Sequence, residues 1–257
     1  MTEVMNVIPG NADRDILFRL LHDNEFSATE AVKEITERTN AAAISPEDGA
    51  VSRHAQDIAY YIFTFARKVC HNEQSQLLEL LLLLRQQVVP DPNQGGILAL
   101  EPASEEFWSD VPWVRVITRS FYFQYVIYGP PKTPGEDRIY ENIVALLAQM
   151  SEHDFCTTGD GMSWAWRSLT SIIHPDAAPI VRNVQVRSVC MWMIYAPNKV
   201  RMNALLLNEG FEVGYWERWK ALLQDYQKVF LDQDTQQLIN TALSNMELVE
   251  RVYPELI

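Results

Sequence analysis

The chain has 257 residues, of which 47% are hydrophobic and 21% are charged. That length fits one large domain or two small ones, and the composition is ordinary for a globular protein. With 34 acidic against 21 basic residues the formal net charge is −13. Such a field repels polyanions, so nucleic acid and anionic membrane surfaces are excluded as expected partners.

The cysteines and the apolar runs predict where the protein resides. Three cysteines, Cys70, Cys156 and Cys190, cannot all pair, which fits a reducing compartment. Residues 1–15 lack the basic and apolar regions of a signal peptide. The most apolar run, Leu77–Leu84, is too short to span a bilayer. We therefore expect a cytoplasmic protein that does not insert into membranes.

Helical periodicity dominates the chain up to residue 87. Asn11 is a candidate cap for the first helix, and Ser27 with Glu30 forms a capping box before the second. The predicted helices cover 12–22, 28–38, 51–68 and 75–87, with a kink at His71–Asn72. Residues 88–104 hold three prolines and two glycines. They are expected to form a loop between two helical halves of a single domain, 1–257.

An aromatic tract over 105–128 stands at the centre of the chain. Pro112 suits the first turn of a helix, with Ser109 or Asp110 as its cap. The β-branched and aromatic content would also fit a strand, but neither alternating set of residues is uniformly apolar. The tract is therefore predicted to be helical and largely buried, with its regular part at 113–128.

The C-terminal part again shows helical periodicity, interrupted by glycines and prolines. The most regular amphipathic helix is expected at 136–151. Further helices are predicted at 162–173, 180–195, 199–207, 215–230 and 235–252. Because the sequence shows no run of strands, no alternation of strand and helix and no fixed repeat, the predicted fold is all-α. We expect an irregular multi-helix bundle with an aromatic-rich core.

Three segments resemble a fungal family of all-helical proteins of unknown function. Residues 107–112 (FWSDVP) are similar to its Trp-x-Asp-Leu-Pro segment, and 216–230 resembles its aromatic penultimate helix. Residues 242–247, with Glu250, resemble its closing helix. Residues 164–170 read WAWRSLT where the family usually reads Trp-x-Asn-Leu-Asn-Ala-Phe. Since some members are encoded among secondary-metabolite genes, the resemblance implies a role in secondary metabolism.

No standard catalytic motif is present. The chain lacks an Asp-Asp-x-x-Asp sequence, a nucleophile elbow, a phosphate-binding glycine loop and a dinucleotide fingerprint. The nearest approach to a metal site is 152–156 (EHDFC), but adjacent side chains point apart and no second cluster follows. His54 and Asp57 could form a base and its orienting group on one helical face, although an exposed pair is the simpler interpretation. We therefore expect no metal and no cofactor.

The aromatic residues leave two interpretations open. On separate helices of a bundle they could be ordinary core, or they could line one apolar cavity with a few polar contacts. In the cavity hypothesis Arg119 and Asn203 are the catalytic polar groups that contact the substrate. The substrate-binding residues are then Trp113, Tyr122, Trp166, Trp192 and Tyr195.

These observations lead to two functional hypotheses. The favoured one is a cofactor-free cyclase or isomerase of fungal secondary metabolism, acting on an apolar small molecule and including pericyclic reactions. Such reactions are accelerated by holding the substrate in a reactive conformer, with hydrogen-bond donors on a carbonyl. The alternative is a non-catalytic helical module for protein interaction.

Overall fold

The computed structural model describes residues 11–93, 95–100, 105–106, 108, 136–155, 161–172, 179–206, 211–230 and 232–254. The chain forms two compact units. Unit 1 comprises Met1–Phe65 and Glu73–Ser120, and unit 2 comprises Ala66–Asn72 and Phe121–Ile257. The loop expected at 88–104 lies within unit 1, and a single domain over 1–257 stays a prediction.

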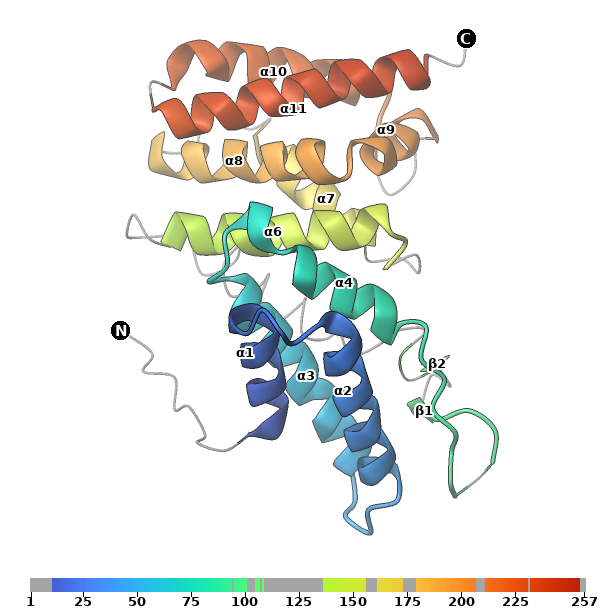
Figure 1. Ribbon diagram of the computed structural model, residues 1–257. Coiled ribbons are helices and arrows are strands. Elements are labelled where there is room, and N and C mark those ends of the chain that lie inside the picture. The colour runs from blue at the N-terminus through green and yellow to red at the C-terminus, as the bar shows by residue number, and fades with distance from the viewer. Residues whose placement is uncertain are drawn as a thin grey trace. The chain divides into compact units, whose positions relative to one another are not determined.

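Unit 1 contains helices that begin at the predicted caps (Figure 1). The side chain of Asn11 accepts hydrogen bonds from the first turn of α1 (Ala12–His22), and Ser27 and Glu30 form the predicted capping box of α2 (Ala28–Ala43). α3 (Ala50–Ala66) and α4 (Ser75–Leu84) follow. Their apolar faces pack together as a hydrophobic core, whose fully buried members include Leu17, Leu20, Ile35, Ile58, Phe63, Leu77 and Leu80.

The aromatic tract is only partly described, and its first residues are extended. β2 (Glu105–Glu106) pairs antiparallel with β1 (Ala99–Leu100). The expectation that helix begins at 105 is therefore wrong. The pairing with β1 gives the physical reason, because it uses backbone groups of residues 105–106 that a helix would bond internally. Trp108 is buried at 1% exposure, whereas the predicted helix 113–128 lies outside the described residues. The short strand pair leaves the all-α class confirmed.

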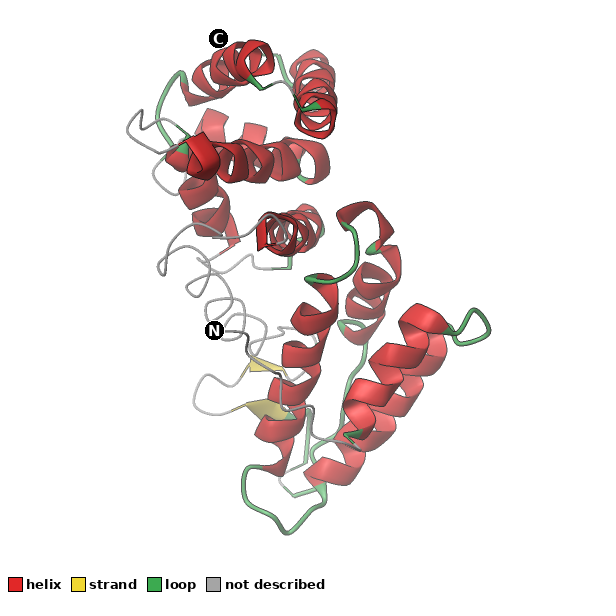
Figure 2. Ribbon diagram, turned by 90° about the vertical axis from the view of Figure 1, so that its left-hand side faces the viewer, coloured by secondary structure: helices red, strands yellow, loops and turns green. Residues whose placement is uncertain are grey.

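Unit 2 is a stack of helices with α8 (Pro179–Tyr195) in its middle. α8 packs against both α6 (Glu136–Glu152) and α11 (Gln233–Val252). The views in Figures 1 and 2 show these helices in successive layers. Residues 189–193 of α8 are all buried, as expected for a helix covered on several sides. The remaining helices of this unit are α7 (Gly161–Ser171), α9 (Pro197–Leu206) and α10 (Tyr215–Val229).

A polar clamp joins α9, α10 and α11. Trp216 donates its indole N–H to Glu250 over 2.8 Å, and Lys220 donates to the other oxygen of the same carboxylate over 2.7 Å. The guanidinium of Arg201 lies 5.1 Å from the centre of the Trp216 ring, within range of a cation–π interaction. Two residues of the family-like segments, Trp216 and Glu250, are thus direct partners.

Within the described residues, no helix combines the length and hydrophobicity that crossing a bilayer requires.

Candidate functional site

The seven predicted site residues fall into different parts of the chain. Trp113, Arg119 and Tyr122 lie outside the described residues. Trp166, Trp192, Tyr195 and Asn203 are described, and all four belong to unit 2.

Trp166 lies in an aromatic cluster at the junction of α7 and α10. Its ring is 5.2 Å from Tyr215 and 5.6 Å from Phe211, measured between ring centres. Tyr215 in turn stacks on Trp219, with ring centres 5.5 Å apart. These separations are those of rings in direct contact. Trp166 therefore serves the packing of α7 against α10.

Trp192 and Asn203 have separate environments. Trp192 is 1% exposed in the middle of α8. Asn203 is half-buried on α9 and donates its side-chain N–H to the carbonyl of Lys199, one turn earlier. The remaining N–H of that amide has no assigned role. A shared cavity for the predicted residues stays a prediction.

Tyr195 has the most informative surroundings of the four. Its hydroxyl lies 2.7 Å from Nδ1 of His71, which is 124 residues away in sequence, and 3.2 Å from the carbonyl oxygen of His71. His71 begins the 3₁₀ turn η1 (His71–Glu73). The carbonyl of His71 also accepts a hydrogen bond from Gln149 on α6. The histidine is therefore fixed by its backbone as well as by its ring.

The other ring nitrogen of His71 faces a buried carboxylate. Its Nε2 lies 3.5 Å from Glu141 on α6, which is 1% exposed. Glu141 accepts a hydrogen bond from Nε of Arg187 on α8, whose side chain is 5% exposed, and another from Arg138 over 3.3 Å. Arg187 also donates to Thr235 of α11 over 2.8 Å. A buried ion pair thus anchors one end of a Tyr–His–Glu row.

The surroundings shift the titration of this row. Burial lowers the pKa of His71 below its ordinary value of 6.5, although the Glu141 charge acts in the opposite direction. Burial also raises the pKa of Tyr195 to about 12, and the charges of Cys70 and Glu141 add to that effect. At neutral pH both groups are therefore uncharged. A neutral histidine that donates through Nε2 to Glu141 presents a bare Nδ1 to the tyrosine O–H.

This row can move a proton without any cofactor. His71 can accept the Tyr195 proton, and the Glu141 carboxylate stabilises the imidazolium that forms. The arrangement follows the logic of a nucleophile, base and orienting carboxylate, with a half-buried phenol in the first position. Within the described residues, the row thus joins a histidine base to the half-buried Tyr195.

Sequence reasoning assigned Tyr195 to substrate binding and His71–Asn72 to a kink. The 3₁₀ turn fits the kink, but the pairing of the two side chains was missed. Neither local spacing nor hydrophobic pattern could have found a contact across 124 residues. The isolated charges of Glu141 and Arg187 within otherwise apolar helical faces were the one available signal, because buried charges require partners.

The family assignment places this row within a known group of proteins. A model of the family described as "Protein of unknown function (DUF3632)" matches residues 60–223, which is more than half of the chain. The chain belongs to the DUF3632 family. The matched range includes the residues of the row, His71, Glu141, Arg187 and Tyr195. The predicted membership of a helical family of unknown function is confirmed. No curated protein and no solved structure matches this chain.

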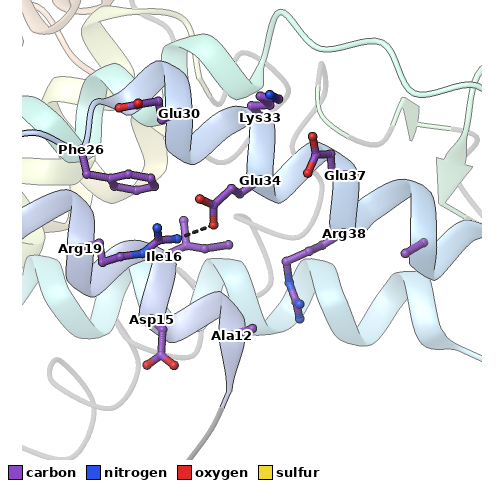
Figure 3. Close-up of a pocket in the computed structure, with 11 residues that line it drawn as sticks. Ala12, Asp15, Ile16, Arg19, Phe26, Glu30, Lys33, Glu34, Glu37 and Arg38 are labelled. Carbon is purple, nitrogen blue, oxygen red and sulfur yellow. Dashed lines mark hydrogen bonds and ion pairs between the residues drawn. The ribbon is translucent and has the colours of Figure 1, made fainter.

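A second candidate site lies in unit 1, outside the residues that match the DUF3632 model. A groove of about 830 Å³ lies between α1 and α2, and Figure 3 shows the side chains that line it. Its floor contains Ile16 and Phe26, and an Arg19–Glu34 ion pair crosses it. Further acidic and basic side chains of α2 form its rim. The mixed lining suits a polar or peptide-like ligand better than a purely apolar one.

Beneath this groove the structure corrects the predicted partner of His54. The carboxylate next to its ring belongs to Asp13 of α1, at 3.1 Å from Nδ1, and Asp57 instead accepts from Asn11. His54 is only 7% exposed, so the interpretation of His54 and Asp57 as an exposed pair is wrong. Asp57 is one turn further along α3 than His54, which is why the sequence suggested it as the partner. The packing of α1 against α3 instead places Asp13 next to the buried His54 ring.

The segment after α6 makes ion pairs and hydrogen bonds with α9. Glu152 accepts a hydrogen bond from Asn198 over 2.9 Å, and Asp154 pairs with Lys199. Cys156 lies outside the described residues. Across the described ranges, no three His, Cys, Asp or Glu side chains gather as metal ligands. Independence from metals and cofactors stays a prediction.

Proposed function

We propose that this protein is a cofactor-free isomerase or cyclase of fungal secondary metabolism. Its reaction would move a proton within an apolar, carbonyl-containing small molecule, or set up a pericyclic ring closure of the enol so formed. The single observation that supports this is the row Tyr195–His71–Glu141. It combines a neutral base, a half-buried tyrosine and a buried orienting carboxylate.

In the proposed reaction Tyr195 is the residue that touches the substrate. His71 takes the phenolic proton, and the phenolate removes a proton from the carbon next to the substrate carbonyl. The same proton returns at another carbon and the phenolic proton returns from His71 to Tyr195, so the reaction is redox-neutral and no oxidant is required. With a pKa of about 12, the Tyr195 phenolate is a strong base for a weakly acidic C–H group, and because the pKa of His71 is lowered, this phenolate forms only transiently.

The remaining predicted residues fit around this centre as proposals. Asn203 or Arg119 would donate a hydrogen bond to the enolate oxygen, the position at which negative charge develops. Trp113, Tyr122, Trp166 and Trp192 would provide apolar walls. The acidic chain would disfavour anionic substrates, which agrees with a neutral, apolar ligand.

The test is deuterium incorporation into a panel of β,γ-unsaturated cyclic ketones in D₂O, followed by mass spectrometry. Exchange catalysed by the wild-type protein should fall by about 10²–10⁴-fold in Tyr195→Phe and in His71→Gln. Tyr226→Phe is the matched control, since Tyr226 is also half-buried in unit 2 and its ring packs on Phe230. Wild-type exchange at the buffer rate, or equal rates in Tyr195→Phe and Tyr226→Phe, would refute the proposal.

The α1–α2 groove favours the alternative, a helical module for protein interaction. It is open along two helices and carries both charge signs, as recognition of a peptide segment would require. Substitutions distinguish the two functions. Charge reversal at Lys33 and Glu37 should abolish partner binding in an interaction module and leave ketone exchange unchanged in an enzyme.

A further inference from the structure

Asp13 is a single carboxylate shared by two cationic or potentially cationic side chains. Its Oδ1 accepts a hydrogen bond from Nε of Arg38 on α2, and its Oδ2 lies 3.1 Å from Nδ1 of His54 on α3. Asp13 is 3% exposed. Burial alone would raise its pKa, but the hydrogen bonds from His54 and Arg38 outweigh burial and hold the pKa below 3.8. Asp13 is therefore ionised throughout the neutral range.

Thr39 of α2 completes the row on the far side of His54. Its hydroxyl lies 3.0 Å from Nε2 of His54 and 2.8 Å from the carbonyl oxygen of Ile35. A hydroxyl has one proton and can donate to only one of these acceptors. If Nε2 carries a proton, the hydroxyl must accept from it and donate to Ile35. If Nε2 is bare, the hydroxyl can donate to the histidine instead.

Arg38 connects this row to the groove. Its guanidinium bonds to Asp13, it lines the groove (Figure 3), and its side chain is 42% exposed. Thr39, its neighbour in sequence, is fully buried. A change in how Asp13 bonds can therefore reach the groove through Arg38. Within the described residues, the Trp108 ring also lies near His54, with ring centres 6.3 Å apart.

We propose that the Asp13–His54–Thr39 row is a proton-operated latch on the α1–α2 groove. A second proton on His54 strengthens its bond to Asp13, loosens Arg38 from that carboxylate and turns the Thr39 hydroxyl onto Ile35. Once His54 is a buried cation beside Asp13, the carboxylate has less need of the second cation, Arg38. Arg38, already partly exposed, is the partner that can move into water, and it then becomes available to an acidic group of a ligand in the groove.

Nuclear magnetic resonance can follow both ends of the latch in the full chain between about pH 8 and pH 5. Imidazole nitrogen shifts report the protonation of His54, and exchange of the Arg38 Nε–H with water reports its bond to Asp13. Because hydroxide catalyses the exchange of every guanidinium N–H, the informative quantity is the ratio of the Arg38 rate to the rate of Arg19, which pairs with Glu34 across the same groove. We expect this ratio to rise about tenfold as His54 takes its second proton, as the loss of one charged hydrogen bond implies.

Two variants make the test specific. In His54→Gln the ratio of the Arg38 to the Arg19 exchange rate should no longer change with pH over this range. In Thr39→Val the hydroxyl that can accept the Nε2 proton is lost, so the rise in this ratio should be smaller than in the wild type. A ratio that stays constant between about pH 8 and pH 5 in the wild type would overturn the proposal, as would an equal rise in Thr39→Val. Should His54→Gln not fold, the wild-type comparison of Arg38 with Arg19 still decides.

Discussion

Glu141→Gln removes one negative charge from the centre of unit 2 without changing the shape of the side chain. Glu141 is 1% exposed, and the Arg187 side chain that donates to it is 5% exposed. Breaking a buried ion pair by removing one partner costs about 3–5 kcal/mol, because the other charge is left uncompensated. Asp232 remains 4.0 Å from Nη1 of Arg187. We therefore expect the lower end, about 3 kcal/mol, which is roughly two decades in the unfolding equilibrium.

Urea denaturation at neutral pH measures this loss as a lower midpoint with an unchanged slope. Glu247→Gln on α11 is the matched control, since Glu247 is exposed and its substitution should stay within about 0.5 kcal/mol. The double variant Glu141→Leu/Arg187→Met should recover most of the loss, because an apolar pair requires no charge compensation. A loss below about 1 kcal/mol in Glu141→Gln would refute the argument that this pair is buried and coupled.

Three further predictions concern other parts of the fold. Burial lowers the pKa of His71, so this histidine takes up a proton at higher pH in the unfolded chain than in the folded one. The free energy of unfolding should therefore fall as pH drops below about 6.5. Urea titrations at several pH values measure this slope, which should be flatter in His71→Gln. Trp216→Phe loses the hydrogen bond to Glu250, so chemical denaturation should show a loss of about 1.5–3 kcal/mol. Ser27→Ala removes the capping-box acceptor and should cost about 1 kcal/mol, measured by thermal unfolding, whereas an unchanged midpoint would contradict the cap assignment.

Most helices could be predicted because their signals are local. Asn11 and Ser27 cap helices whose N-terminal N–H groups they satisfy, and both were expected caps. The end of α2 was set too early, at 38 instead of 43. Thr39 and Asn40 weaken the helical pattern of the sequence, but Thr39 is buried against His54 and its hydroxyl bonds back to Ile35, so packing extends the helix.

The polar clusters could not be predicted, for a physical reason. Asp13 meets His54 across 41 residues and His71 meets Tyr195 across 124, so each pair exists only after helices have packed. Sequence spacing finds partners one helical turn apart, which is why Asp57 was considered for His54. The aromatic residues were visible from composition. Whether they enclose a cavity depends on side-chain directions that periodicity alone does not give.

Unit 2 is assembled from two pieces of chain, Ala66–Asn72 and Phe121–Ile257, and the second segment of unit 1, Glu73–Ser120, lies between them in the sequence. His71 arrives with the short piece, whereas Glu141 and Tyr195 arrive with the long one. A C-terminal fragment beginning at residue 121 would consequently lack the imidazole and leave a buried carboxylate facing an empty position. Truncation is therefore a poor way to isolate the proton-transfer row. Complementation of that fragment with a peptide spanning 66–72 would restore it, and circular permutation could join the two pieces in one continuous chain.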